Sequence, residues 1–248
     1  MSIPILRLIN LAILLFMLVF LSRYVWDLFF GTAYEPVEWE TARKNQLVPK
    51  DLIRAADNYA DKVRFFCIWL QVERIRKEKI PGSFAELGVY KGETARLIHL
   101  MDTERAFHLF DTFKGFSPSD LEQETGEAAS YTPKNFRDTD REEVLKTIGG
   151  DPSKLIIHSG YFPDSAGGAE NELFAFVSMD ADLYKPTLAG LDFFYPRLSP
   201  SGVIIIHDYN HKWEGLKRAV DEFCAAIPET PVLIPDLQGS IMIVKSKA

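Results

Sequence analysis

Hydrophobic positions divide the chain into a continuously apolar N-terminal stretch and a longer part in which apolar runs alternate with helical patterns. Within residues 8–22 only Asn10 and Ser22 are polar, so apolar side chains fall on every face of a helix. This pattern is typical of a helix in lipid or in a deep core. Counted over residues 3–22, the stretch is about the 20 residues that span a bilayer.

Three interpretations of this N-terminal stretch are open. We favour a membrane anchor over residues 1–34, with membrane association through residues 3–30, because the run is apolar on every helix face. Tyr24 and Trp26 follow it as interfacial aromatics do. A cleaved signal peptide is the second, since Gly31, Thr32 and Ala33 resemble a cleavage site, although bulky aromatics separate them from the apolar run. The third is a helix that packs on the protein itself or on a second copy in a homo-oligomer.

Residues 35–82 are predicted to form a helical extension. Apolar positions that recur at steps of four and three are Leu52, Ala56, Tyr59, Val63, Phe66 and Leu70. Their spacing predicts one long helix that begins after Pro49. The basic residues at 74–79 are favourable near its C-terminus, and Pro81 and Gly82 stop it.

Residues 83–248 alternate between strand and helix patterns. The predicted strands are 83–87, 106–111, 154–158, 174–180, 203–207, 231–234 and 240–244, and the predicted helices are 93–101, 141–148, 186–198 and 213–227. Strands separated by helices predict an α/β fold with a mostly parallel seven-stranded sheet, preceded by N-terminal helices. The last two strands are joined by a short turn, which predicts an antiparallel hairpin at the C-terminal end.

One segment, residues 112–140, lacks sustained periodicity and is rich in Ser, Thr, Gly, Pro and acidic residues. It follows directly after a predicted strand. A long irregular segment in that position favours a lid over an active site. Its aromatic residues Phe113, Phe116, Tyr131 and Phe136 are candidates for covering a substrate or for packing the lid shut.

Charge and cysteine content exclude several classes. Residues 1–34 carry a net charge of +1, and the acidic remainder carries −8 of the total of −7. An acidic body without a basic tract argues against nucleic acid as a partner. The two cysteines, Cys67 and Cys224, are too few for a disulfide framework or a cysteine zinc site, and their apolar contexts predict buried thiols.

The first two strands of the sheet end in residues suited to a nucleoside ligand. Glu86, Gly88 and Gly92 open the turn into the next helix, where glycine allows close approach to the backbone. Tight helix packing is an equally good reason for these glycines. Asp111 ends the second strand and suits hydrogen bonds to ribose hydroxyls. Both signals indicate a ribose-containing ligand, which could be NAD or S-adenosylmethionine. The missing G-x-G-x-x-G fingerprint disfavours NAD.

Acidic residues follow the fourth and fifth strands. Asp180 and Asp182 are two positions apart and lie on one side if strand geometry persists, and His207 and Asp208 end the next strand. Three carboxylates that converge without a matching Lys or Arg would repel one another, and a hard divalent cation would relieve this. The alternative is two unrelated groups of turn-capping aspartates.

Together these motifs resemble the macrocin O-methyltransferase (TylF-like) family. The resemblance covers roughly residues 50–248, and it rests on IPGSFAELGVYKGETA, HLFDTFKGF, SGYFPDS, GLKRAVDEF and, most specifically, the D-x-D-x-Y pattern paired with Asp208 and Tyr209. It implies a Rossmann-like S-adenosylmethionine methyltransferase domain over residues 83–248. The residues that it assigns to cofactor binding are Glu86, Gly88, Tyr90, Gly92, Thr94, Asp111, Ser159, Gly160 and Phe162.

The resemblance also implies metal binding by Asp180 and Asp208, with Asp182 as candidate base. Family members often carry an aspartate at the position of His207, which leaves this residue open as a metal ligand, a base or an orienting partner of Asp208. The implied activity is Mg²⁺-assisted methylation of a hydroxyl on a sugar or other polyhydroxylated small molecule. An intracellular cofactor places the body in the cytoplasm or on the cytoplasmic face of a membrane. An NAD-dependent oxidoreductase and a non-catalytic, membrane-tethered nucleoside- or sugar-binding module are the alternatives.

Overall fold

The computed structural model describes residues 3–30 and 35–247, and the chain divides into two compact units, Met1–Asn45 and Gln46–Ala248. The first unit contains helices α1 (Ile3–Phe30) and α2 (Val37–Lys44). The cleavage site considered at Gly31, Thr32 and Ala33 lies outside the described residues.

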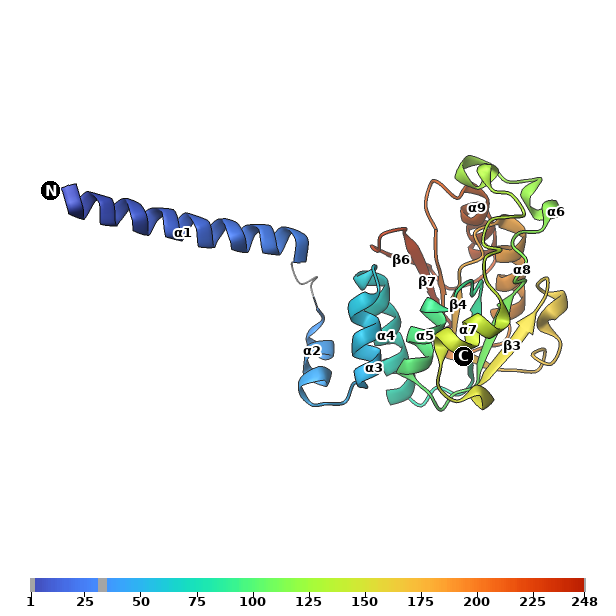
Figure 1. Cartoon of the computed structure of the whole chain (residues 1–248). Coiled ribbons are helices and arrows are strands. Elements are labelled where there is room, and N and C mark those ends of the chain that lie inside the picture. The colour runs from blue at the N-terminus through green and yellow to red at the C-terminus, as the bar shows by residue number, and fades with distance from the viewer. Residues whose placement is uncertain (1–2, 31–34, 248) are drawn as a thin grey trace. The chain divides into compact units, whose positions relative to one another are not determined.

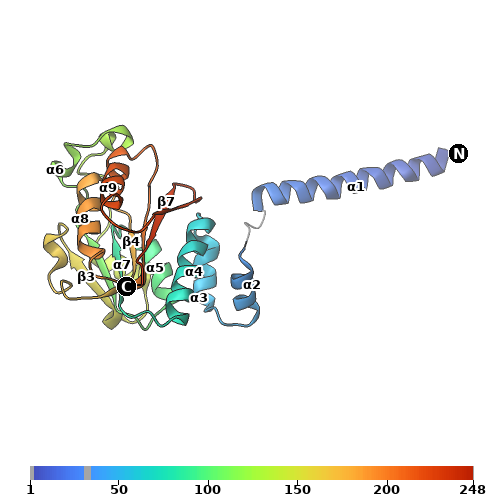
Figure 2. The same ribbon diagram turned by 180° about the vertical axis from the view of Figure 1, so that it is seen from behind.

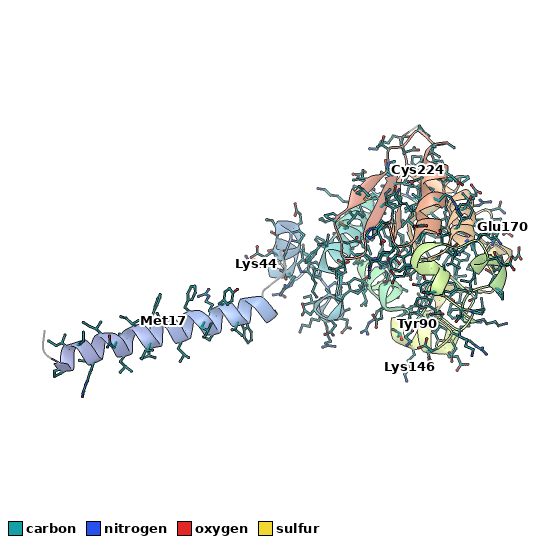
Figure 3. All side chains as sticks on the ribbon, turned by 90° about the horizontal axis from the view of Figure 1, so that it is seen from above. Met17, Lys44, Tyr90, Lys146, Glu170 and Cys224 are labelled. Carbon is teal, nitrogen blue, oxygen red and sulfur yellow. The ribbon has the colours of Figure 1, made fainter. Side chains whose placement is uncertain are left out.

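Helix α1 is apolar on all sides. Its side chains stand out around the whole helix, including that of Met17 (Figure 3), and the exposed fraction is 72% for Phe16. The segment Pro4–Trp26, with a mean hydropathy of 2.5, is long and apolar enough to cross a membrane by length and composition. A signal sequence has the same properties.

The second unit is built on a seven-stranded sheet with the order β3-β2-β1-β4-β5-β7-β6. Its strands are β1 (Ser83–Leu87), β2 (Phe107–Asp111), β3 (Leu155–Ser159), β4 (Phe174–Met179), β5 (Leu198–Ile206), β6 (Val232–Ile234) and β7 (Ser240–Val244). Strands β1 to β5 pair in parallel, and β7 pairs antiparallel with both β5 and β6. The predicted α/β sheet with a C-terminal antiparallel hairpin is therefore confirmed.

Helices cover both faces of this sheet (Figures 1 and 2). On one face lie α3 (Lys50–Asn58), α4 (Lys62–Lys77), α5 (Glu93–Met101) and α7 (Arg141–Ile148), and on the other lie α8 (Tyr184–Phe194) and α9 (Glu214–Cys224). Strand β4 is buried along its whole length, as expected for a central parallel strand covered on both sides. The layers hold the carboxyl ends of β1 to β5 at one edge, where ligands bind in such sheets.

The single long helix predicted after Pro49 is wrong. Two helices are present, and they are separated at Tyr59, which has extended backbone dihedrals. The Asp61 carboxylate accepts a hydrogen bond from the Arg64 backbone N–H and so caps the start of α4. A short acidic side chain that bonds to the backbone competes with a continuous helix, and periodicity does not register this competition.

Some predicted boundaries also differ. Helix α8 ends at Phe194, four residues before the predicted end, and β5 begins at Leu198, well before the predicted start at Val203. The cause is Ser201, whose positive φ of 65° lets the strand continue through a Pro-Ser-Gly sequence that is typical of a turn. Cys67 and Cys224 are free thiols as predicted, but each is only partly buried.

Candidate active site

A cavity of about 460 Å³ opens at the carboxyl ends of strands β1 to β5. The predicted site residues that line it are Glu86, Gly88, Tyr90, Thr94, Asp111, Gly160, Phe162, Asp180, Asp182, His207 and Asp208. Residues separated by more than 100 positions in the chain thus share one cavity, because parallel strands deliver their ends to the same edge of the sheet.

Gly88 is required by the close approach of two strand ends. Its φ is 83°, and a Cβ atom at this position would lie 2.0 Å from the Asp180 carbonyl oxygen. A side chain would therefore push apart β1 and β4, which carry the two halves of the site. Beside it, Glu86 is 1% exposed, and its Oε2 has no hydrogen-bond partner among the described residues. Burial, reinforced by the charges of Asp180 and Asp111, raises the pKa of Glu86 well above its ordinary value.

Asp111 organises the turn after β1. One of its oxygens, Oδ2, accepts hydrogen bonds from the backbone N–H groups of Val89 and Tyr90, both at 2.9 Å, and Oδ1 accepts one from Phe113 at 2.7 Å. A carboxylate has about four acceptor positions, so one remains for a ligand. Asp111 therefore anchors the turn after β1 and also lines the cavity.

Gly92 and Ser159 do not line the cavity, in contrast to the prediction. At Gly92 the φ is 80°, and a Cβ atom would lie 3.2 Å from a Val144 methyl, so this glycine serves the packing of α7. Ser159 is exposed at the end of the edge strand β3, whereas the neighbouring His158 is buried. Gly160, with a φ of 142°, and Phe162 remain at the end of β3 beside the cavity.

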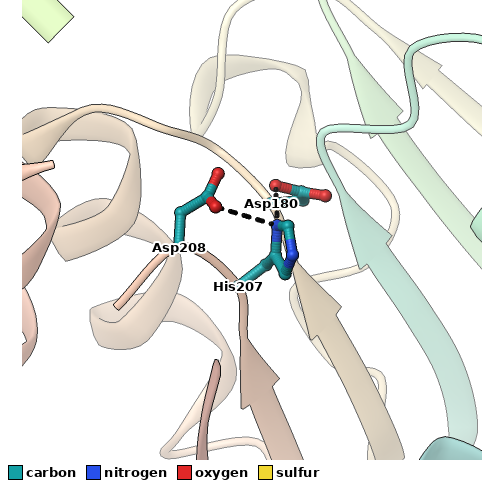
Figure 4. Close-up of side chains that lie close together, drawn as sticks. All are labelled: Asp180, His207 and Asp208. Carbon is teal, nitrogen blue, oxygen red and sulfur yellow. Dashed lines mark hydrogen bonds and ion pairs between the residues drawn. The ribbon is translucent and has the colours of Figure 1, made fainter. Parts of the chain in front are cut away.

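Asp180, His207 and Asp208 form the charged end of the cavity. The imidazole Nδ1 of His207 lies 3.2 Å from Asp180 Oδ1 and 3.4 Å from Asp208 Oδ1 (Figure 4). Potential ligand atoms of the three residues lie within 4.8 Å of one another. Although burial opposes a charged imidazole, the Asp180 carboxylate raises the pKa of His207 to about 10.

Arg64 supplies a second positive charge that the sequence did not reveal. Its Nη2 donates to Asp180 Oδ2 at 3.2 Å, and its side chain is only 6% exposed. The premise that no Lys or Arg accompanies the carboxylates is therefore wrong. Burial alone would raise the pKa of Asp180, but His207 and Arg64 hold it well below the ordinary range.

Asp182 lines the cavity, but not through continued strand geometry. The strand ends at Met179, and Asp182 has a φ of 59°, in the left-handed region that non-glycine residues rarely adopt. Burial and the nearby charges of Asp180 and Asp208 raise the pKa of Asp182 well above its ordinary value. The surroundings therefore shift the pKa of Asp180 downward and that of Asp182 upward.

Residues 112–140 cover the cavity with aromatic side chains. Phe116, Tyr131 and Phe136 line it, and their rings contact one another at centroid distances of 5.2 to 5.9 Å. The segment contains α6 (Pro118–Leu121) and a 3₁₀ helix (Gly126–Ser130). Tyr90 contacts Phe136 through its ring and donates to Asp138 through its hydroxyl at 2.9 Å. This arrangement fits the predicted lid, with Phe113 absent from the cavity lining.

Arg64, which contacts Asp180, and the cavity residues Asp120, Trp213 and Gln238 were not predicted as site residues. The sequence carried no signal for Arg64, because nothing in its local pattern connects it with Asp180, 116 positions away in the chain. Asp120 and Gln238 line the cavity from segments without periodicity, and Trp213 lies at the start of the predicted helix of residues 213–227, where its sequence position gave no sign of a cavity residue.

Comparisons with known proteins agree with this architecture. The family model "Macrocin-O-methyltransferase (TylF)" matches residues 34–233. A relative from Streptomyces olivaceus, 8-demethyl-8-(2,3-dimethoxy-alpha-L-rhamnosyl)-tetracenomycin-C 4'-O-methyltransferase, is 27% identical in an alignment of 154 residues that covers 56% of this chain and 57% of the relative. The match thus spans little more than half the length of that relative.

Two solved structures share the fold. The O-methyltransferase NovP superimposes with a TM-score of 0.64 at 24% identity, covering 75% of this chain and 81% of NovP. The calicheamicin methyltransferase CalS11 superimposes with a TM-score of 0.56 at 19% identity, covering 86% of this chain and 94% of CalS11. The family match favours a methyltransferase over the oxidoreductase alternative. The chain belongs to the macrocin O-methyltransferase (TylF) family of enzymes.

Proposed function

We propose that this protein transfers a methyl group from S-adenosylmethionine to a hydroxyl of a sugar or a related polyhydroxylated small molecule. The observation that carries the proposal is that Glu86 and Asp111, at the ends of β1 and β2, line the same cavity as the carboxylates of Asp180, Asp182 and Asp208. The sugar class is supported by the Streptomyces relative, whose name specifies 4'-O-methylation of a tetracenomycin that carries a rhamnosyl group.

In this proposal the β1, β2 and β3 ends hold the cofactor. Asp111 accepts from the ribose hydroxyls with its remaining acceptor position, and Gly88 allows the ligand to approach the backbone. The buried Glu86 has an unpartnered oxygen that suits a cationic amino group of the cofactor. Tyr90, Thr94, Gly160 and Phe162 border the same ligand.

The acceptor lies at the β4 and β5 ends. The O–CH₃ bond forms as the S–CH₃ bond breaks, the sulfonium takes the electron pair and becomes a thioether, and the hydroxyl proton passes to an Asp182 carboxylate oxygen. The aromatic lid residues exclude water, and holding the two substrates in line supplies a large part of the acceleration.

The chemistry of the donor set fits a divalent cation. Asp208 Oδ1 is buried with the His207 Nδ1 at 3.4 Å, and two carboxylates with one imidazole are ligand types that bind divalent cations. We propose that Asp180 and Asp208 hold Mg²⁺, with His207 as a ligand after losing its proton or as the group that orients Asp208. Held by Asp180 and Asp208, Mg²⁺ would supply positive charge that offsets the negative charge around Asp182 and would increase the acidity of the acceptor hydroxyl.

Asp182→Asn tests the proposed base. With methyl-labelled S-adenosylmethionine and membrane and soluble extracts of the source as acceptors, we expect at least about a 100-fold loss of transfer at unchanged cofactor affinity. Asp192→Asn is the matched control, since Asp192 is an exposed acidic residue of α8. Binding of NAD but not of S-adenosylmethionine in a calorimetric titration would refute the proposed methyl donor. Full methyl transfer by Asp182→Asn would refute Asp182 as the base.

We further propose that α1 anchors the protein on the cytoplasmic face of a membrane. The double substitution Leu14→Asp and Leu18→Asp places two charges at the middle of the span, at a cost of about 3 kcal/mol each. We expect the wild-type protein to resist carbonate extraction and this variant to become soluble. Degradation of the body by protease added to intact cells would contradict the cytoplasmic orientation.

A further inference from the structure

Asp120 is a buried carboxylate of the cavity that the proposed mechanism does not use. It lies on α6 within the lid segment, and only 4% of its side chain is exposed. Its Oδ1 accepts a hydrogen bond from the Tyr161 hydroxyl at 2.9 Å, with Lys185 Nζ at 3.8 Å and Ser119 Oγ at 3.4 Å. No described residue donates to its second oxygen, Oδ2.

The position of Asp120 along the sheet indicates which part of a ligand it meets. Its partner Tyr161 follows β3, the edge strand that lies beyond β2 from the carboxylates at the ends of β4 and β5. Methyl transfer requires the sulfonium near Asp182, and Asp111 on β2 takes the ribose. The base of the cofactor then lies one strand further, at the β3 end, where Asp120 and Tyr161 line the cavity with Gly160 and Phe162.

The chemistry of a carboxylate discriminates among bases. An ionised aspartate only accepts hydrogen bonds, and adenine presents a donor in its exocyclic N6 amino group. Hypoxanthine carries a carbonyl oxygen at the same position, which a carboxylate repels. A site built around one such hydrogen bond rejects the analogue that lacks it.

Resting on the proposed use of S-adenosylmethionine, the geometry points to Asp120 as the residue that accepts a hydrogen bond from the adenine N6 amino group and thereby sets base specificity. The Tyr161 hydroxyl is a positioning group, because it occupies Oδ1 and leaves Oδ2 for the base. A purely structural Asp120 would only tie the lid to Tyr161 and to Lys185, whose Nζ also donates to the Ser119 carbonyl.

The test compares S-adenosylhomocysteine with its inosine analogue as ligands of the full chain in calorimetric titrations. We expect the wild-type protein to prefer the adenosine compound by at least about tenfold, the size of one charge-assisted hydrogen bond. Asp120→Asn should reduce this preference to within about threefold, because an amide also donates to the hypoxanthine carbonyl. Asp192→Asn should keep the wild-type preference.

Tyr161→Phe gives a second measurement that does not depend on folding of the Asp120 variant. It keeps the carboxylate but removes its hydroxyl partner, and we expect an intermediate preference. Equal weakening of both ligands by Asp120→Asn, or no preference in the wild-type protein, would overturn the assignment. Binding of neither ligand to the wild-type protein would instead overturn the proposed function, so the two failures are distinguishable.

Discussion

The two ends of the cavity neutralise their carboxylates in different ways. At the β2 end, Asp111 accepts hydrogen bonds from three backbone N–H groups. At the β4 and β5 ends, Asp180 faces the side chains of Arg64 and His207. Backbone donors are fixed by the fold, so the first end is suited to constant recognition of a ligand. Side-chain cations exchange protons or partners, so the second end is suited to chemistry.

The histidines show the same contrast. His207 lies between carboxylates, which raise its pKa to about 10 against the effect of burial. His108 on β2 lies in the core, where its Nδ1 is 2.9 Å from His158 Nε2 and its ring stacks on that of Phe110. Burial, with a smaller effect of His158, lowers the pKa of His108 to about 4. The His207 imidazole is thus charged beside the proposed chemistry, and the His108 imidazole is neutral in the core.

Asp180→Asn changes the β4 and β5 ends of the cavity and gives the largest expected effect. It removes a charge that pairs with Arg64 and His207, and we expect methyl transfer to fall by at least about 100-fold while cofactor affinity changes less than about threefold. Transfer assays with labelled S-adenosylmethionine, with Mg²⁺ or EDTA, measure it. Undiminished activity of the variant, or full wild-type activity in EDTA, would refute metal assistance.

Asp111→Asn is the matching change at the β2 end of the cavity. The amide has one acceptor oxygen instead of two, and its NH₂ opposes backbone N–H groups, so the turn at Val89 and Tyr90 loosens. We expect S-adenosylhomocysteine to bind about 10- to 100-fold more weakly, as for loss of a charge-assisted hydrogen bond. Calorimetric titration with Asp192→Asn as control measures this. Unchanged affinity would show that Asp111 serves the fold alone.

His108 should make stability depend on pH. Its pKa is about 4 in the folded protein against 6.5 when unperturbed, so the unfolded state binds the proton first. Stability should therefore fall as the pH drops from about 6.5 to 4, by up to about 1.4 kcal/mol per pH unit. Denaturant titrations across this range should give a shallower dependence for His108→Gln than for the control His211→Gln, which removes an exposed imidazole. Equal slopes would argue against a neutral His108.

Asp138→Asn should give the smallest effect, because the contacts that it changes are exposed. Asp138 accepts from the Tyr90 hydroxyl at 2.9 Å and from Lys91 Nζ at 2.7 Å, joining the lid to the turn after β1. Exposed pairs contribute little, so we expect the KM for the acceptor to rise no more than about threefold at constant kcat. A large fall in kcat would instead give this contact a role in catalysis.

Much of the fold could be predicted because its signals are local. The strand of residues 83–87 and the helices of residues 93–101 and 141–148 have the predicted bounds. The break between Asn58 and Lys62 was missed, because the apolar spacing continues across it while the Asp61 cap ends the helix. Ser159 is exposed because it ends the edge strand β3, while Leu155 on the same face of that strand is buried.

The sequence by itself determined the sheet, the glycine turn at Gly88 and the placement of Asp111, Asp180 and Asp208 at strand ends, because these follow from periodicity and from the common direction of parallel strands. Only the tertiary structure decided that Arg64 pairs with Asp180, 116 positions away in the chain, and that Asp120 joins the cavity. Such contacts depend on how helices and irregular segments pack, and short-range patterns carry no information about partners so distant in sequence.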